Sequence, residues 1–119
     1  QLHGGDFHAD ALPRGADVIS FVRVIHDHDD DKAQALLARA RAALEPGASL
    51  ILAEPMAGTV GAEAMGAAYF NFYLHAMGSG RARRPEVLMA MLGQAGFGQP
   101  RLLPTATPLQ TQLIHAIAK

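Results

Sequence analysis

Two short apolar runs lie in the first half of the chain, and the first of them is rich in β-branched residues. The first covers residues 18–25 (VISFVRVI) and the second covers residues 49–53 (SLILA), after which Glu54-Pro55 closes the run. Short continuous apolar runs of this kind are typical of parallel strands that are covered on both faces. The pattern therefore predicts two buried parallel strands.

Between these two runs the apolar residues change to helical spacing. They recur three and four positions apart, at Ala33, Leu36, Leu37, Ala40, Ala43 and Leu44. Asp29 and Asp30 suit the N-terminus of this helix, because acidic residues cap it and interact favourably with its dipole. Pro46-Gly47 ends it. A strand, a helix and a strand with short links predict a right-handed parallel crossover.

The second half of the chain alternates in the same way. Residues 63–77 form a predicted helix with aromatic side chains on more than one side, which indicates contact with both the core and a second apolar partner. A further helix is predicted from Pro85 to about Ala95. Proline suits its first position, and Gly96 suits its stop.

The last predicted elements are two strands near residues 101–103 and 112–118, joined by a long loop over 104–108. An antiparallel hairpin at the edge of an otherwise parallel sheet is common. Residues 2–7 are a candidate for the end of a further strand. The predicted fold class is therefore α/β, with parallel strands, crossover helices and a closing antiparallel hairpin in one domain.

The composition narrows the classes of function. Of the 119 residues, 50% are hydrophobic, which is enough for one buried core, and 18% are charged. The net charge of −1 without a basic block argues against nucleic acid and anionic membranes as partners. The absence of cysteine excludes disulfides and thiolate metal sites and favours a cytoplasmic setting. No apolar run reaches the ~20 residues that span a bilayer.

His26 and Glu54 directly follow the two predicted parallel strands. The carboxyl ends of neighbouring parallel strands meet at one edge of a sheet, where ligands bind, so these side chains are expected to lie side by side. A carboxylate that holds one ring N–H leaves the other ring nitrogen free to accept a proton, as a general base requires. The alternative is structural: His26 caps a strand and Glu54 binds backbone.

The acidic segment after the first strand also allows a metal site. His26 and His28, together with the carboxylates of residues 27–31, could bind a divalent ion. Helix capping accounts for most of these aspartates, so no metal is predicted. The three arginines within residues 81–84 are expected to be solvated. Residues 4–7 (GGDF) form either a tight turn or a close approach to a ligand.

Taken in order, these segments resemble the plant-type and bacterial family of S-adenosylmethionine-dependent O-methyltransferases. The resemblance rests on GGDF, ADVISFVRVIHDHDD, ALEPGASLILAEP, GSGRARRPE and LGQAGF, and it covers nearly the whole chain. Members of this family methylate small hydroxylated molecules such as phenols, flavonoids, polyketides and carotenoids, and the EPMAGT and YFNFYLHAMGSGRAR segments look most like the carotenoid-acting members. The resemblance implies that residues 1–119 form the C-terminal half of a Rossmann-like methyltransferase domain.

The resemblance also implies roles for individual residues. In that family the histidine after the first of these strands deprotonates the substrate hydroxyl, and the glutamate that closes the next strand orients it. His26 and Glu54 match these two positions, and Asp6 and Phe7 match residues that flank the adenine end of S-adenosylmethionine. The helix before the GSGR segment lines the acceptor pocket in the family, so the candidate pocket walls are Met65, Tyr69, Phe72, Tyr73 and Met77.

Four positions depart from the plant pattern. Val22 stands where plant members have a lysine near the cofactor. His28 stands where plant members have an aromatic residue, which leaves stacking on the adenine in doubt. Ala82 replaces a second glutamate, so the base is oriented by Glu54 alone or by Asp27. Arg84 replaces the threonine that caps the following helix, and arginine is a poor N-cap.

The family's glycine-rich cofactor loop and its helical dimerisation domain lie upstream of GGDF. We therefore expect the chain, which begins at Gln1, to be part of a longer protein that forms a homodimer. Two other classes stay open: a ligand-binding α/β module without chemistry, and a metal-binding domain built on His26, His28 and the neighbouring aspartates. A zinc titration that releases no heat would remove the metal-binding class.

Overall fold

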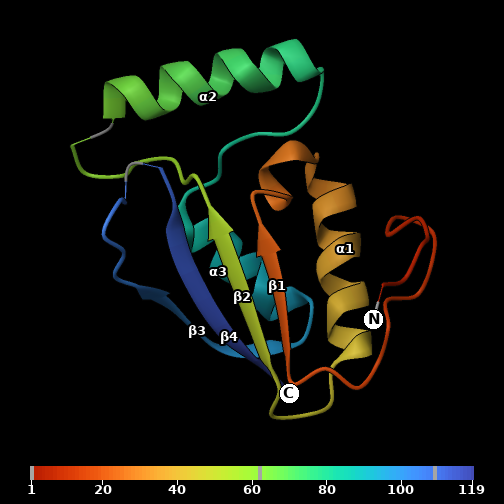
Figure 1. Cartoon of the computed structure of the whole chain (residues 1–119). Helices are drawn as coiled ribbons and strands as arrows, with labels where there is room; N and C mark the ends of the chain where they lie inside the picture. The colour runs from red at the N-terminus through yellow and green to blue at the C-terminus, as the bar shows by residue number, and fades with distance from the viewer. Residues whose placement is uncertain (1, 62, 109) are drawn as a thin grey trace.

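The computed structural model describes residues 2–61, 63–108 and 110–119. Within them it contains one four-stranded sheet with the order β1-β2-β4-β3 (Figure 1). β1 and β2 are parallel, whereas β4 is antiparallel to both β2 and β3. The strands are β1 (Val18–Val22), β2 (Ser49–Glu54), β3 (Phe97–Leu103) and β4 (Gln112–Ala118). The predicted α/β class with a closing antiparallel hairpin is confirmed.

Three α-helices and one turn of 3-10 helix complete the described chain. They are η1 (Ile25–Asp27), α1 (Asp30–Ala43), α2 (Glu63–Met77) and α3 (Pro85–Gln94). α1 and α3 contact each other beside the sheet, whereas α2 lies across the carboxyl ends of β1 and β2 (Figure 1). No described helix combines the length and the apolar character that crossing a lipid bilayer requires.

The core lies between one face of the sheet and the helices α1 and α3. Its fully buried side chains come from both layers and include Leu36, Leu37, Leu50, Leu52, Leu88, Leu92, Phe97 and Ile114. Alternate residues of a strand point to opposite faces, so Val18 and Val22 of β1 point away from this core and are 51% and 59% exposed. The described chain therefore covers one face of its sheet and leaves the β1 end of the other face open.

Two predicted strand boundaries are wrong, and a local irregularity of the backbone explains each. The run at 18–25 forms a strand only to Val22, because Arg23 adopts a left-handed φ of 56° and the chain turns into η1. β3 begins at Phe97 rather than near residue 101, because an irregularity between Gly98 and Arg101 interrupts its pairing and hides its period. Residues 2–7 form no strand; residues 7–9 are a turn.

Candidate active site

His26 and Glu54 meet at the carboxyl ends of β1 and β2. The parallel register places Val22 beside Ala53, so η1 follows β1 at the level where Glu54 ends β2. Nδ1 of His26 lies 2.6 Å from Oε2 of Glu54. The two side chains are 4% and 1% exposed, so this contact is shielded from water. The structure thus brings together the two residues that were expected to lie side by side.

The second oxygen of Glu54 holds the backbone that leads to His26. Oε1 accepts hydrogen bonds from the N–H groups of Val24, at 3.0 Å, and Ile25, at 2.8 Å. Because Oε1 accepts these two backbone N–H groups, Oε2 is the oxygen that faces the imidazole ring. The ring proton is therefore assigned to Nδ1, which leaves Nε2 as the acceptor of the neutral imidazole.

Asp27 lies on the other side of the same ring. Its Oδ1 is 3.2 Å from Nε2 of His26, and its side chain is 30% exposed. This oxygen has no hydrogen-bond partner among the described residues. Two acceptors facing each other do not attract, so the contact becomes favourable only when Nε2 carries a proton. Both carboxylates considered for orienting the ring, Glu54 and Asp27, therefore lie against it.

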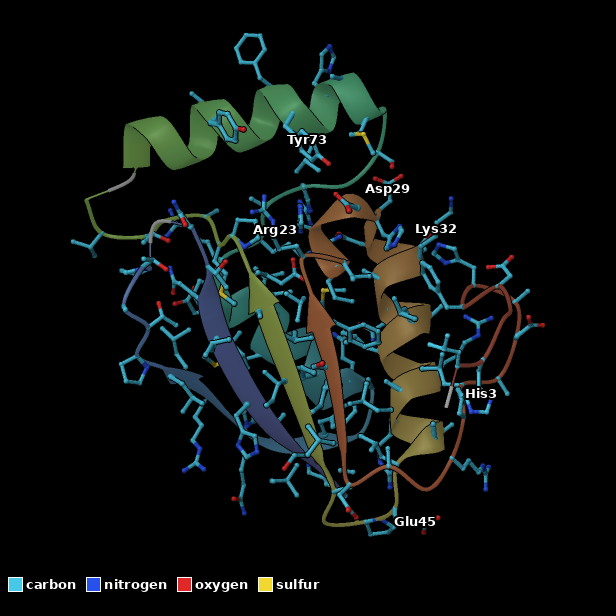
Figure 2. The ribbon with its side chains drawn as sticks, in the orientation of Figure 1. His3, Arg23, Asp29, Lys32, Glu45 and Tyr73 are labelled. Carbon is cyan, nitrogen blue, oxygen red and sulfur yellow. The ribbon has the colours of Figure 1, made fainter. Side chains whose placement is uncertain are left out.

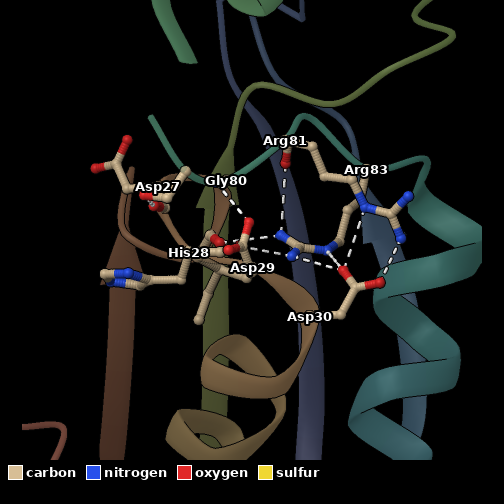
Figure 3. Close-up of polar contacts among 9 residues, drawn as sticks. Asp27, His28, Asp29, Asp30, Gly80, Arg81 and Arg83 are labelled. Atoms are coloured by element: carbon tan, nitrogen blue, oxygen red, sulfur yellow. Dashed lines mark hydrogen bonds and ion pairs between the residues drawn. The ribbon is translucent and has the colours of Figure 1, made fainter. Parts of the chain in front are cut away.

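The clasp loop, which we define as residues 78–84 between α2 and α3, covers the segment that carries His26 (Figure 3). Ser79 Oγ donates to the carbonyl of Asp27 at 3.0 Å, and the N–H of Gly80 donates to Oδ1 of Asp29 at 3.0 Å. Asp29 occupies the N-cap position of α1 but makes no side-chain cap bond. The expectation that Asp29 caps this helix is therefore wrong, because its carboxylate binds the clasp loop instead.

Arg83 is the buried member of the arginine cluster. Its side chain is 1% exposed, whereas that of Arg81 is 59% exposed. Arg83 donates from Nη1 to the carbonyl of Ile25, at 3.0 Å, and from Nη2 to that of His28, at 2.7 Å. It also reaches Asp30 Oδ1 through Nε and Nη2 (Figure 3). The expectation of a solvated loop is wrong for Arg83, because backbone carbonyls and a carboxylate replace its water.

Arg83 and Arg81 lower the pKa of the Asp30 carboxylate. Hydrogen bonds from Arg83 hold the pKa of Asp30 below its ordinary value of 3.8, against the opposing effect of burial. A lowered folded-state pKa stabilises the fold above pH 3.8, and this stability is lost as the pH falls through the folded-state pKa.

Replacing Asp30 with asparagine should therefore lower the free energy of unfolding more at pH 7 than near pH 2. The expected loss is about 1 kcal/mol or less, because Asp30 is half-exposed. Urea unfolding of both proteins across this range measures the difference. Asp31→Asn removes a charge from the same helical turn and serves as the control. A loss that is equal at both pH values would contradict the ion pair.

Gly80 packs directly on the peptide between His26 and Asp27. Its φ is +85°, and a Cβ at this position would collide with the carbonyl oxygen of His26 and lie 2.6 Å from the Asp27 carbonyl carbon. Gly78, in the same loop, has a φ of +76° but open space around its Cβ position. Substitutions at these two glycines can therefore be compared to separate the cost of backbone strain from the cost of steric contact.

Gly80→Ala should destabilise the protein markedly more than Gly78→Ala. Both variants incur the strain of a left-handed residue, of about 1–3 kcal/mol, and only the first also forces the clasp loop off the segment that carries His26. Chemical unfolding of the two variants side by side measures the difference. Equal losses would show that the loop does not rest on this peptide.

The residues expected at the cofactor lie in the N-terminal segment. Asp6 Oδ1 accepts the N–H of His8 at 2.8 Å, which forms a tight turn. Phe7 and His8 both contact the ring of His28, with centroid distances of 5.8 and 4.6 Å. Burial, followed by the nearby charge of His8, lowers the pKa of His28. A cavity of about 480 Å³, lined by residues 3–7 and 10–14, adjoins this turn.

The candidate pocket walls lie on α2, above the His26 edge of the sheet. Tyr69, Phe72, Tyr73 and Met77 are all exposed, and Tyr73 lies on the side of α2 that faces the sheet (Figure 2). The side chain of Met65 lies outside the described residues. A cavity of about 470 Å³ opens where α2 meets the clasp loop. The described part of α2 thus presents an apolar surface close to the site.

Within the described ranges, no three histidine, aspartate or glutamate side chains are grouped to hold a metal ion. Nδ1 of His26 is taken by Glu54, and the ring of His28 faces Phe7 and His8 instead of His26. The residues considered for metal binding are therefore divided between two different clusters.

Comparison with known proteins places the chain in a family. An O-methyltransferase domain model matches residues 1–98. Demethylspheroidene O-methyltransferase of Rhodobacter capsulatus is 46% identical over 112 residues, which are 94% of this chain and 28% of that protein. The chain therefore spans under a third of this relative's length.

Two solved structures share the fold over almost the whole chain. TnmH superposes with a TM-score of 0.80 at 34% identity, covering 98% of this chain and 34% of TnmH. Human N-acetylserotonin methyltransferase, solved in complex with SAM, superposes with a TM-score of 0.78 at 28% identity, covering 97% of this chain and 32% of that enzyme. With the domain model matching residues 1–98, the chain belongs to the O-methyltransferase family.

Proposed function

We propose that the protein containing this chain transfers a methyl group from S-adenosylmethionine to a hydroxyl of a small molecule, with His26 as the general base. The observation that carries the proposal is the buried contact of 2.6 Å between Nδ1 of His26 and Oε2 of Glu54, which leaves Nε2 as the acceptor. Family membership and the neighbour solved with SAM support the reaction class.

The cofactor supplies a methyl group on a positively charged sulfur, which is already a good leaving group, so the proposal needs no metal. The N-terminal residues fit its adenine end. Phe7 is 42% exposed and lies beside His28, which offers a partly open aromatic surface to a flat base. His28 stands where an aromatic residue was expected, and its lowered pKa favours the neutral ring, which suits stacking better than a cation.

The chain's own residues move one proton. As the acceptor oxygen forms its bond to the methyl carbon and the carbon–sulfur bond breaks, the hydroxyl proton passes to Nε2 of His26. Glu54 fixes the orientation of the ring by accepting the Nδ1–H, and its charge balances the imidazolium that forms. Access of the hydroxyl to Nε2 requires the partly exposed Asp27 side chain to move aside.

The acceptor is an extended apolar alcohol in this proposal, such as a carotenoid. The relative from R. capsulatus is named for a carotenoid substrate, and Tyr69, Phe72 and Met77 are exposed side chains on α2, the helix that lies across the carboxyl ends of β1 and β2. An aliphatic alcohol is much less acidic than a phenol, so its methylation depends more strongly on a base.

The chain is the C-terminal portion of a catalytic domain in this proposal. A preceding region would supply the glycine-rich cofactor loop and a helical homodimerisation domain, and we place the whole protein in the cytoplasm. β1 lies at one edge of the described sheet, which is consistent with a sheet that continues beyond the described residues. Among the described strands β1 pairs only with β2.

A methyl-transfer assay tests the reaction. The protein for this assay joins the chain to the preceding region of the R. capsulatus relative, and labelled S-adenosylmethionine is offered with a carotenoid alcohol, a phenol and a carotenoid without a hydroxyl. We expect an O-methyl ether with the alcohol, none with the hydroxyl-free compound, and no effect of a chelator. Transfer to nitrogen or carbon, or loss of activity on chelation, would overturn the proposal.

The two non-enzymatic classes have less support. A metal site on His26 and His28 would need both rings in one cluster, and they lie in different clusters. A ligand-binding module without chemistry offers no reason to bury a histidine between two carboxylates, because burying ionisable groups costs free energy.

A further inference from the structure

We propose that Arg83 is a positioning residue for the base, holding the main chain on both sides of His26 so that Nε2 stays directed at the acceptor. The proposal rests on the proposed role of His26. The carbonyl of Ile25 immediately precedes His26 and that of His28 follows Asp27, and Arg83 binds both of them through its two terminal nitrogens.

The segment that carries His26 is too short to hold its own shape. η1 has three residues, and its closing hydrogen bonds are long, at 3.2 Å from the Asp27 N–H and 3.3 Å from the His28 N–H. Such 3-10 turns have poor hydrogen-bond geometry and are stabilised by their surroundings. The orientation of the imidazole therefore depends on groups outside the turn.

Glu54 and Arg83 bind opposite ends of the peptide dipoles in η1: one binds N–H groups and the other binds carbonyl groups. Glu54 accepts the N–H groups of Val24 and Ile25, while Arg83 donates to the carbonyls of Ile25 and His28. The two buried ions contact the same turn, and each satisfies backbone groups that the turn leaves without strong partners. Together Glu54 and Arg83 fix the position and the rotation of η1 at the end of β1.

Asp30 completes the arrangement by balancing the buried charge. Arg83 is 1% exposed, and the half-exposed Asp30 supplies the opposite charge beside it. Asp30, the first residue of α1, accepts from Nε and Nη2 at 2.9 and 2.8 Å. Ala82 stands where the plant pattern has a second glutamate, so the clasp loop has no carboxylate that could contact the His26 ring. The clasp loop acts on His26 through the main chain instead.

Arg83→Lys tests the proposal in the same complete protein. A lysine keeps the charge but cannot bind two carbonyls and a carboxylate in the planar geometry of a guanidinium. We expect kcat to fall by about 10²-fold, as a displacement near 1 Å can cause, with the KM for the cofactor within about twofold. Arg81→Ala removes an exposed partner of the same Asp30 and should leave kcat within about twofold.

A spectroscopic readout separates positioning from general stability. The Nδ1–H proton of His26, in its short hydrogen bond to Glu54, should give a strongly downfield nuclear magnetic resonance signal that shifts or is lost in Arg83→Lys and persists in Arg81→Ala. If Arg83→Lys does not fold, Asp30→Asn weakens the same anchor, and we expect a smaller change of kcat and signal in the same direction.

An unchanged kcat per folded molecule together with an unchanged His26 signal would overturn the positioning role and leave Arg83 a purely structural residue. His26→Gln separates this outcome from a failure of the proposed function. If that variant keeps full activity while Arg83→Lys still moves the His26 signal, Arg83 positions the ring but the ring is not the base.

Discussion

Replacing His26 with glutamine lowers kcat by about 10²–10⁴-fold and leaves cofactor affinity nearly unchanged. A general base contributes a factor of this size, and a weakly acidic alcohol places the catalysed step at the upper end of the range. The ring lies at the carboxyl ends of β1 and β2, whereas the residues that we propose for the cofactor lie in the N-terminal turn, so we expect cofactor binding to be spared.

Methyl-transfer kinetics and isothermal calorimetry with the cofactor measure these two quantities. His115→Gln is the matched control, because His115 also hydrogen-bonds a side chain, Ser49, but from β4 and away from the site. A kcat for His26→Gln within a few fold of the unmodified protein would refute the assignment of the base.

Replacing Glu54 with glutamine is expected to lower kcat by on the order of 10²–10⁴-fold. The amide oxygen can still accept the N–H groups of Val24 and Ile25, but the amide NH₂ then faces Nδ1 of His26 as a donor. The ring must move its proton to Nε2, the atom that should accept one. The same change of tautomer at a catalytic triad costs about 10⁴-fold.

The Glu54→Gln protein should also lose stability by about 1–3 kcal/mol, because a charged hydrogen-bond acceptor is exchanged for a neutral one in a buried site. Activity per folded molecule separates the two effects. Glu45→Gln makes the same chemical change at an exposed position and serves as the control. A Glu54→Gln protein with normal kcat and only reduced stability would mean that Glu54 supports the backbone and does not orient the base.

The sequence pattern was sufficient to predict two parallel strands and the proximity of the residues at their carboxyl ends. The apolar runs at 18–25 and 49–53 are short and flank a helix with short links, so strand type and parallel direction followed from them. Parallel pairing then leaves little freedom for residues that directly follow the strands, which is why His26 and Glu54 lie together. Residues 2–7, with two glycines and no strong period, offered no such constraint.

The support around His26 could not be predicted from the chain alone. Arg81, Arg83 and Arg84 are neighbours of the same type, and only the fold distinguishes the buried one from the exposed ones. Asp29 and Asp30 precede an amphipathic helix, where capping is the usual role, but the clasp loop binds both carboxylates instead. These contacts join residues about 50 positions apart, beyond the reach of local propensity.

The aromatic residues on α2 were predicted as pocket walls from the family resemblance, and their role is decided by what covers them. Phe72 is 80% exposed in the described chain. The helix has apolar residues on several sides, so periodicity alone did not assign a buried face. An acceptor bound between α2 and the His26 edge would cover Tyr73, which lies on the side of α2 that faces the sheet (Figure 2).

A crystal structure of the complete protein with S-adenosylhomocysteine and the acceptor alcohol tests the role of His26 most directly. We expect the acceptor oxygen at about 2.6–3.2 Å from Nε2 of His26, with Asp27 turned aside and Nδ1 still hydrogen-bonded to Glu54. An acceptor hydroxyl bound to another group, with Nε2 still covered by Asp27, would contradict it.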